Sequence, residues 1–177
     1  MIDTSNPASK KITCGSMTQL NRLFYVRPSA SGTSISEVPG GSPIHASTLR
    51  TDGTLAVAVY EPESKSIFLL EGNTPAYGES LKVKRTLVVQ SGGTGCLALF
   101  PYASGYFFLY DSVEGSAADR TNALCLLYPQ GGRYERSVLF SSKEPITGMK
   151  AVFRGSSFYV LVSVNALELV SVSLSSK

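Results

Sequence analysis

Residues 53–71 read GTLAVAVYEPESKSIFLLE, which is two apolar runs on either side of a short polar stretch. The first run extends from Thr54 to Tyr60 and the second from Ser66 to Leu70, and the break at 61–65 contains a proline. Two β-rich runs joined by a few turn-forming residues predict a β-hairpin. The same layout returns in GYFFLYDS…NALCLLYPQGG, in SSFYVLVSVNALELVSVSL and, in shorter form, in NRLFYVRPSASGTSISEVPGG.

The composition favours a folded, all-β protein. Hydrophobic residues make up 43% of the 177 residues and charged residues only 16%, against roughly 25% in typical soluble domains. A formal charge of +3 is too small to indicate nucleic-acid binding. The polar residues 1–10 are expected to form a flexible tail, and residues 11–177 a single all-β repeat domain.

The cysteines, the N-terminal segment and the apolar runs indicate where in the cell the protein is located, and the cysteines favour a reducing compartment. Three cysteines, Cys14, Cys96 and Cys125, form no CxxC pair, so a disulfide framework is not expected. The N-terminal MIDTSNPASKK lacks the apolar core of a secretory signal peptide, and no run reaches the roughly 18 apolar residues of a membrane span. We therefore expect an intracellular, cytoplasmic protein that does not contact membranes, or one that is exported by an unusual route.

A longer repeat organises the hairpins. The segments SPIHASTLR (42–50), SGGTGCLALF (91–100) and EPITGMKAVF (144–153) begin about 50 residues apart, and a period of about 40 to 50 residues with four strands per unit is typical of β-propellers. Inner blade strands are covered on both faces and hence continuously apolar, as Phe158 to Val162 is. At this period the chain holds between three and four blades, fewer than propellers usually have.

The fold prediction is therefore a propeller-like repeat of four-stranded antiparallel blades. It is either incomplete or closed by a composite blade that uses the strands before Pro39, and a β-sandwich or barrel is the alternative. Roughly eleven short strands are expected. The exposed edges of an incomplete ring would favour a homo-oligomer, such as a homodimer, or a ring completed by a partner.

Residues able to support catalysis are sparse. His45 is the only histidine and no Gly-x-Ser-x-Gly segment accompanies it, so a serine–histidine triad is not expected. The glycine-rich 91–95 precedes a strand instead of the helix that a phosphate loop needs, and the carboxylates lack glycosidase or calcium-loop spacing. We predict a non-enzymatic binding module without cofactor or metal, whose partner is a protein or a glycan. The long polar loop expected at 111–121 and the blade faces are the candidate protein contacts.

One set of side chains favours a ligand site. A hairpin over Asn21 to Glu37 brings Arg22 and Glu37 to the same end, with Tyr25 nearby. Arginine and glutamate in one plane can hold vicinal sugar hydroxyls through charge-assisted hydrogen bonds, and an aromatic ring can cover the apolar sugar face. The alternative is a surface ion pair worth ~0–1 kcal/mol.

The stretches RLFYVRPSASGTSISE and GSPIHASTLRTDGTLAVAVYEPESKSIFLLE resemble repeats of the fungal fucose-specific lectins. Those proteins are six-bladed propellers in which a strand carrying Arg and an aromatic residue is followed by a Glu after the hairpin turn. The resemblance implies sugar binding at Arg22, Tyr25 and Glu37; the second unit has Ala56 and Glu71 at the equivalent places. Repeat lectins gain avidity from several weak copies, and here at most one copy keeps the charged pair. A protein-interaction scaffold is therefore the predicted function, with a fucose-type lectin as the alternative.

Overall fold

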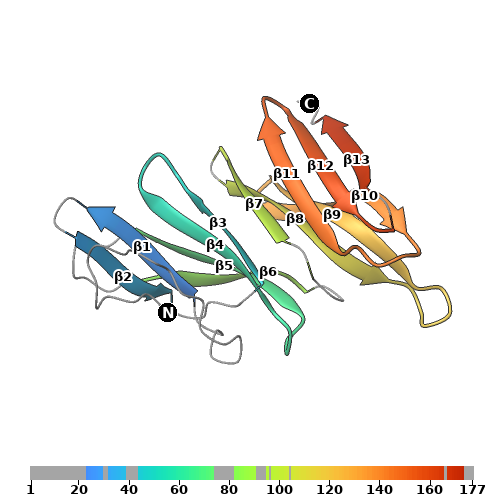
Figure 1. The fold of residues 1–177 in the computed structure, drawn as a ribbon, viewed down its shortest axis with the longest axis horizontal. Helices are drawn as coiled ribbons and strands as arrows, with labels where there is room; N and C mark the ends of the chain where they lie inside the picture. Colours follow the sequence, from blue (N-terminus) through green and yellow to red (C-terminus); the bar gives the residue numbers. More distant parts are fainter. Residues whose placement is uncertain are drawn as a thin grey trace.

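The computed structural model is all-β. It describes residues 23–29, 32–38, 44–73, 82–90, 95, 97–103, 105–165 and 167–173, with the backbone alone for 23–29, 32–38 and most of 167–173. The described residues form thirteen strands and no helix (Figure 1). None of these residues therefore belongs to a helix that could span a membrane. The tail expected at 1–10 lies outside the described residues.

Each sheet is antiparallel and consists of strands that are consecutive in the chain. The sheets follow one another along the long axis of the molecule (Figure 1). A two-stranded sheet contains β1 (Leu23–Ser29) and β2 (Gly32–Val38). Sheet I contains β3 (His45–Leu49), β4 (Thr54–Glu61), β5 (Ser66–Asn73) and β6 (Lys84–Gln90). Sheet II contains β7 (Leu97–Tyr102), β8 (Gly105–Glu114), β9 (Thr121–Gln130) and β10 (Arg133–Ser142). Sheet III contains β11 (Gly148–Arg154), β12 (Ser157–Ser163) and β13 (Leu167–Ser173).

The predicted hairpin over 53–71 is confirmed as β4 and β5, which pair from Thr54↔Asn73 to Glu61↔Ser66. The four-stranded antiparallel sheets are confirmed in sheets I and II. Among the described strands, β1 pairs only with β2, and sheet III has three strands and ends at β13. The described strands thus form neither the composite blade nor a closed barrel.

Sheet II lies between sheets I and III, and alternate residues of its central strands face opposite neighbours. On β8, Tyr106 and Phe108 lie in the core shared with sheet I, whereas Phe107 and Leu109 lie in the core shared with sheet III. Strand β9 alternates in the same way. A strand covered on both faces has to be apolar at every position, which explains the continuous runs YFFLY and ALCLL.

Two sequence expectations need correction. The loop expected at 111–121 is shorter, because β8 continues to Glu114 and β9 begins at Thr121, with Ser112 buried opposite Ala123. Residues 111–114 therefore lie within β8 and pair with β9, and only residues 115–120 connect the two strands. Strand β12 was expected to be covered on both faces, but Tyr159 is 46% exposed and Leu161 is 39% exposed.

The connection between β8 and β9 depends on Gly115. Its φ is 85°, and an added Cβ would collide with the carbonyl oxygen of Asp119. We expect Gly115→Ala to lower the free energy of unfolding by about 1–3 kcal/mol, measured by urea denaturation. Gly131 also has a positive φ, 57°, but open space around it, so Gly131→Ala should lose only about 1 kcal/mol. Equal losses would show that the carbonyl contact does not matter.

Candidate functional site

The structure leaves the sequence-predicted sugar site untested. Arg22 lies outside the described residues, Tyr25 is in β1 and Glu37 is in β2. The backbone register pairs Glu37 with Phe24 and Tyr25 with Ser36, so Tyr25 and Glu37 are not direct cross-strand partners. This site remains a prediction.

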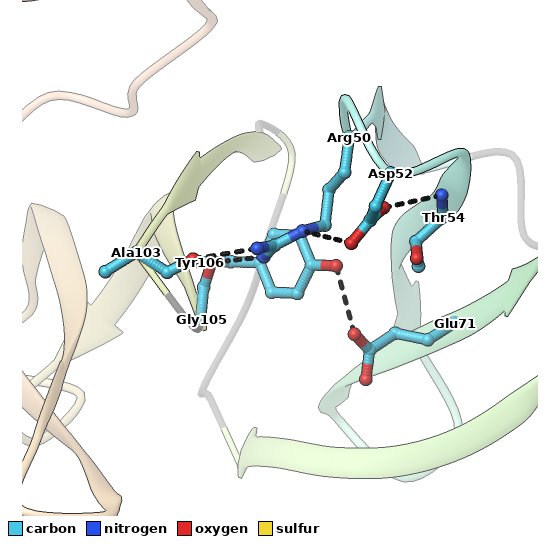
Figure 2. A network of polar contacts seen from close by, with 7 residues as sticks. All are labelled: Arg50, Asp52, Thr54, Glu71, Ala103, Gly105 and Tyr106. Carbon is cyan, nitrogen blue, oxygen red and sulfur yellow. Dashed lines mark hydrogen bonds and ion pairs between the residues drawn. The ribbon is translucent and has the colours of Figure 1, made fainter.

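A different arginine, tyrosine and glutamate meet between sheets I and II (Figure 2). Arg50 begins the turn from β3 to β4, and its backbone N–H donates to Thr54 O at 2.9 Å. In the same turn, Asp52 Oδ1 accepts the Thr54 N–H at 2.9 Å, and this hydrogen bond lowers the pKa of the exposed Asp52 carboxyl. The turn thereby fixes the position from which the Arg50 side chain leaves sheet I.

The Arg50 guanidinium reaches across to the turn between β7 and β8. Its Nη2 donates to Ala103 O at 2.8 Å and its Nη1 to Gly105 O at 3.4 Å. Its Cζ lies 5.5 Å from the centroid of the Tyr106 ring, and its Nε is 3.5 Å from Asp52 Oδ2. Charged hydrogen bonds and a cation–π contact thus join sheet I to sheet II.

Tyr106 completes the connection from the other side. Its ring is buried, and its hydroxyl donates to Glu71 Oε1 on β5 at 3.0 Å. Burial, with the Glu71 hydrogen bond and charge, raises the pKa of Tyr106 from the usual 10 to about 12, and the positive charge of Arg50 opposes this rise. The phenol therefore remains a neutral hydrogen-bond donor at ordinary pH. We refer to Arg50, Asp52, Glu71 and Tyr106 as the Arg50 network.

Glu71 also borders a shallow groove of about 490 Å³. The groove presents hydrogen-bonding side chains of both charges, and it is lined by Thr54, Glu71, Gly72, Asn73, Lys82, Val83 and Lys84. At Gly72 an added Cβ would collide with the carbonyl oxygen of Lys82, so this position in the groove lining requires glycine. The carboxylate of Glu71, the amide of Asn73 and the ammonium groups of the lysines supply acceptors and donors of the kind that bind a polyhydroxylated ligand.

A second hollow of about 360 Å³ lies where the first strands of sheets I, II and III begin. His45, Leu97 and Thr147 contribute to its lining. The Thr147 hydroxyl is within hydrogen-bonding distance of two Ser163 atoms, its carbonyl oxygen at 3.2 Å and its Oγ at 3.1 Å, so this hydroxyl is held within sheet III.

Cys125 lies in a polar cluster that is structural. Arg136 forms an ion pair with Glu114 and contacts Tyr110 Oη at 3.1 Å and Cys125 Sγ at 2.9 Å, which ties β8, β9 and β10 together. Burial raises the pKa of the Cys125 thiol to about 12, so the thiol stays protonated and unreactive. Across the described ranges, His, Cys, Asp and Glu residues form no group of three or more that could hold a metal ion.

No protein-family model matches the chain, and neither a curated protein nor a solved structure is found to be similar to it. A function therefore has to be inferred from the residues and their arrangement.

Sequence reasoning missed the Arg50 network because its members are far apart in the chain. The resemblance to the lectin repeats gives Ala56 as the counterpart of Arg22 and considers only residues of the same hairpin. In the structure the arginine is Arg50, in the preceding turn, and the aromatic ring is Tyr106 from the following sheet. A sequence signal does exist, since an arginine directly before Thr51-Asp52-Gly53 marks a charged side chain at a tight turn.

Removing the Tyr106 hydroxyl should measure the contribution of the network to stability. We expect Tyr106→Phe to lower the free energy of unfolding by about 0.5–1.5 kcal/mol near neutral pH, because Glu71 loses a buried donor. The exposed Tyr102→Phe is the matched control and should change stability little.

The loss in free energy of unfolding caused by Tyr106→Phe should depend on pH. The unfolded phenol ionises near pH 10 and the folded phenol near 12, so the contribution of Tyr106 is fully present below pH 10 and is lost as pH rises toward 12. The difference between variant and wild type should therefore shrink over that interval in urea denaturation. A difference that stays constant would show that Tyr106 is not protected from ionisation.

Proposed function

We propose that the chain is a non-enzymatic protein-interaction scaffold of the β-propeller type. It binds its partner on the face of sheet III that carries Tyr159 and Leu161 and that no other described sheet covers, which we call the uncovered face. The propeller description is supported by the order of the sheets, because the first strands of successive sheets contact each other, β3 with β7 and β7 with β11. Inner blade strands meet in this way around a propeller axis.

The observation that carries the proposal is a comparison of equivalent positions in the three sheets. The hairpin of β7 and β8 ends in the pair Tyr102↔Gly105, and that of β11 and β12 in the pair Arg154↔Ser157. Counting from these pairs, Tyr159 and Leu161 correspond to Phe107 and Leu109.

These equivalent positions differ sharply in burial. Phe107 is 2% exposed and Leu109 is 0% exposed, because sheet III covers them. In sheet I the second strand is β4, as β8 is in sheet II, and its Ala56 and Ala58 face sheet II and are also fully buried. Only in sheet III do the equivalent residues, Tyr159 and Leu161, face outward and remain exposed. An exposed apolar face at a position that is buried elsewhere in the fold is typical of a binding surface.

Site-specific photo-crosslinking tests the scaffold. A photoreactive amino acid at position 159, in the chain expressed in its native cells, should give one predominant protein adduct. The matched control carries the photoreactive amino acid in place of Leu87 on β6, which is 53% exposed, and should not give that adduct. No adduct at 159, or the same adducts from both positions, would contradict the proposal.

The second candidate function is carbohydrate binding. It is favoured by the meeting of Arg50, Tyr106 and Glu71, because Glu71 also lines the 490 Å³ groove. A glycan array tests this function directly. Binding to fucosylated glycans that Glu71→Gln abolishes would identify this groove as a sugar site. Binding that Arg22→Ala abolishes would instead support the site predicted at Arg22, Tyr25 and Glu37.

A further inference from the structure

We propose that the uncovered face of sheet III binds an acidic protein partner, whose apolar side chains are presented from a strand or sheet and flanked by carboxylates. This inference rests on the proposed scaffold function and specifies the chemistry of its partner.

The register of sheet III defines the contact face. Val152 pairs directly with Tyr159, and Lys150 with Leu161, so these side chains share one face of the sheet. Val152 is 60% exposed, more than either Tyr159 or Leu161. A compact apolar centre therefore lies open on the side of sheet III away from sheet II, whereas Phe158, Val160 and Val162 face the core.

Positive charge flanks this apolar centre. Lys150 and Arg154 are exposed and lie two residues before and after Val152 on β11, so all three project to the same side. Neither cation forms a salt bridge with another described residue. Glu168, the single acidic residue on the strands of sheet III, pairs with Val162 and thus lies on the opposite face.

The positive charges on this face favour an acidic partner over a second copy of the chain. Two copies of the chain that met through it would bring Lys150 and Arg154 of both copies into one apolar interface, and like charges so placed disfavour association. A partner with carboxylates around an apolar centre would satisfy both features at once. Charge complementarity therefore favours an acidic partner over a second copy.

The geometry indicates the form in which the partner presents its side chains. Tyr159 and Leu161 are spaced by two residues along β12, which is the period of a strand, and Val152 adds a contact on the neighbouring strand. The equivalent positions in sheets I and II are each covered by the next sheet, so the fold accepts strands packed face to face. A β-hairpin with apolar residues on one face is therefore a suitable probe.

The test uses two synthetic disulfide-closed β-hairpin peptides with the same apolar face, flanked by glutamates in one and by lysines in the other. Fluorescence anisotropy measures their binding to the full chain at low and high salt. We expect the acidic hairpin to bind at least about tenfold more tightly than the basic one, and this preference to weaken at high salt. Equal binding of both hairpins, or binding of neither, would overturn the proposal.

Variants assign the binding to the face. Tyr159→Ser should weaken binding of the acidic hairpin roughly tenfold or more, as expected for an aromatic residue at the centre of an interface. The double variant Lys150→Glu/Arg154→Glu should reverse the preference in favour of the basic hairpin, and this reversal is a readout that misfolding cannot produce. The control Leu87→Ser should bind both hairpins as the wild type does. Unchanged binding in both face variants would overturn the proposal.

The remaining outcomes identify other occupants. A dimer in light scattering that Tyr159→Ser returns to a monomer would show that a second copy covers the face. Binding of the acidic hairpin only after deletion of residues 1–22 would show that the chain covers its own face. Either result overturns the proposal.

The two experiments separate this proposal from the scaffold function. A crosslinked partner at position 159, together with equal binding of the two hairpins, contradicts only the acidic character of the partner. Failure of both the crosslinking and the hairpin binding contradicts the scaffold function as well.

Discussion

Leu109→Asp is expected to prevent stable folding. The Leu109 side chain is fully buried between sheets II and III, where a carboxylate would have neither water nor a partner. Burying an unpaired charge in place of a packed leucine should cost on the order of 5 kcal/mol or more, which is comparable to the whole stability of a small domain. Circular dichroism and urea denaturation should show an unfolded or strongly destabilised chain.

Leu161→Asp is the matched control, because Leu161 occupies the equivalent position of sheet III. Its side chain is 39% exposed, so a carboxylate there stays hydrated and should lower the free energy of unfolding by less than about 1 kcal/mol. Similar losses in the two variants would mean that the face of sheet III is covered and that the proposed binding surface does not exist.

Phe158→Ala should produce the second-largest loss of stability. The Phe158 ring is fully buried and packs against Phe153 at 4.6 Å, Phe107 at 5.1 Å and Phe100 at 5.4 Å between ring centroids. The contacts with Phe107 and Phe100 join sheet III to sheet II, so truncation removes apolar burial and leaves a cavity between the sheets. We expect the free energy of unfolding to fall by about 3–5 kcal/mol in urea denaturation.

The adjacent residue is the control for this prediction. Tyr159→Ala removes a ring of similar size from the other face of the same strand, where the ring is 46% exposed and lies across from Val152. The loss should stay below about 1 kcal/mol. Comparable losses at the two positions would contradict the alternation of β12 between a core face and an open face.

Local pattern predicted much of the fold. The hairpin of β4 and β5 follows from two apolar runs and a polar break, and the sequence anticipated all-β structure with four-stranded antiparallel sheets. The misplaced boundary at 111–121 has a physical cause, because Asp111 and Ser112 are polar residues within a strand. The Asp111 side chain accepts the Gly95 N–H at 2.7 Å, a contact between distant segments that a local pattern does not reveal.

The site was harder to predict than the fold, because it depends on how sheets pack. Arg22 and Glu37 were selected since one hairpin could join them, whereas Arg50 and Tyr106 meet across two sheets. The continuous apolar run from Phe158 to Val162 predicted a strand covered on both faces, and the structure leaves one of those faces open. We interpret this disagreement between pattern and structure as a sign of function, because residues that break local expectations often do so at binding surfaces.

Hydroxyl-radical footprinting of the unmodified chain, read residue by residue by mass spectrometry, tests the open face of sheet III most directly. The structure predicts rapid oxidation of Tyr159 and Leu161 and protection of their equivalents Phe107 and Leu109. Protection of Tyr159 to the same degree as Phe107 in the isolated chain would show that sheet III is covered on both faces, and would contradict the proposed binding surface.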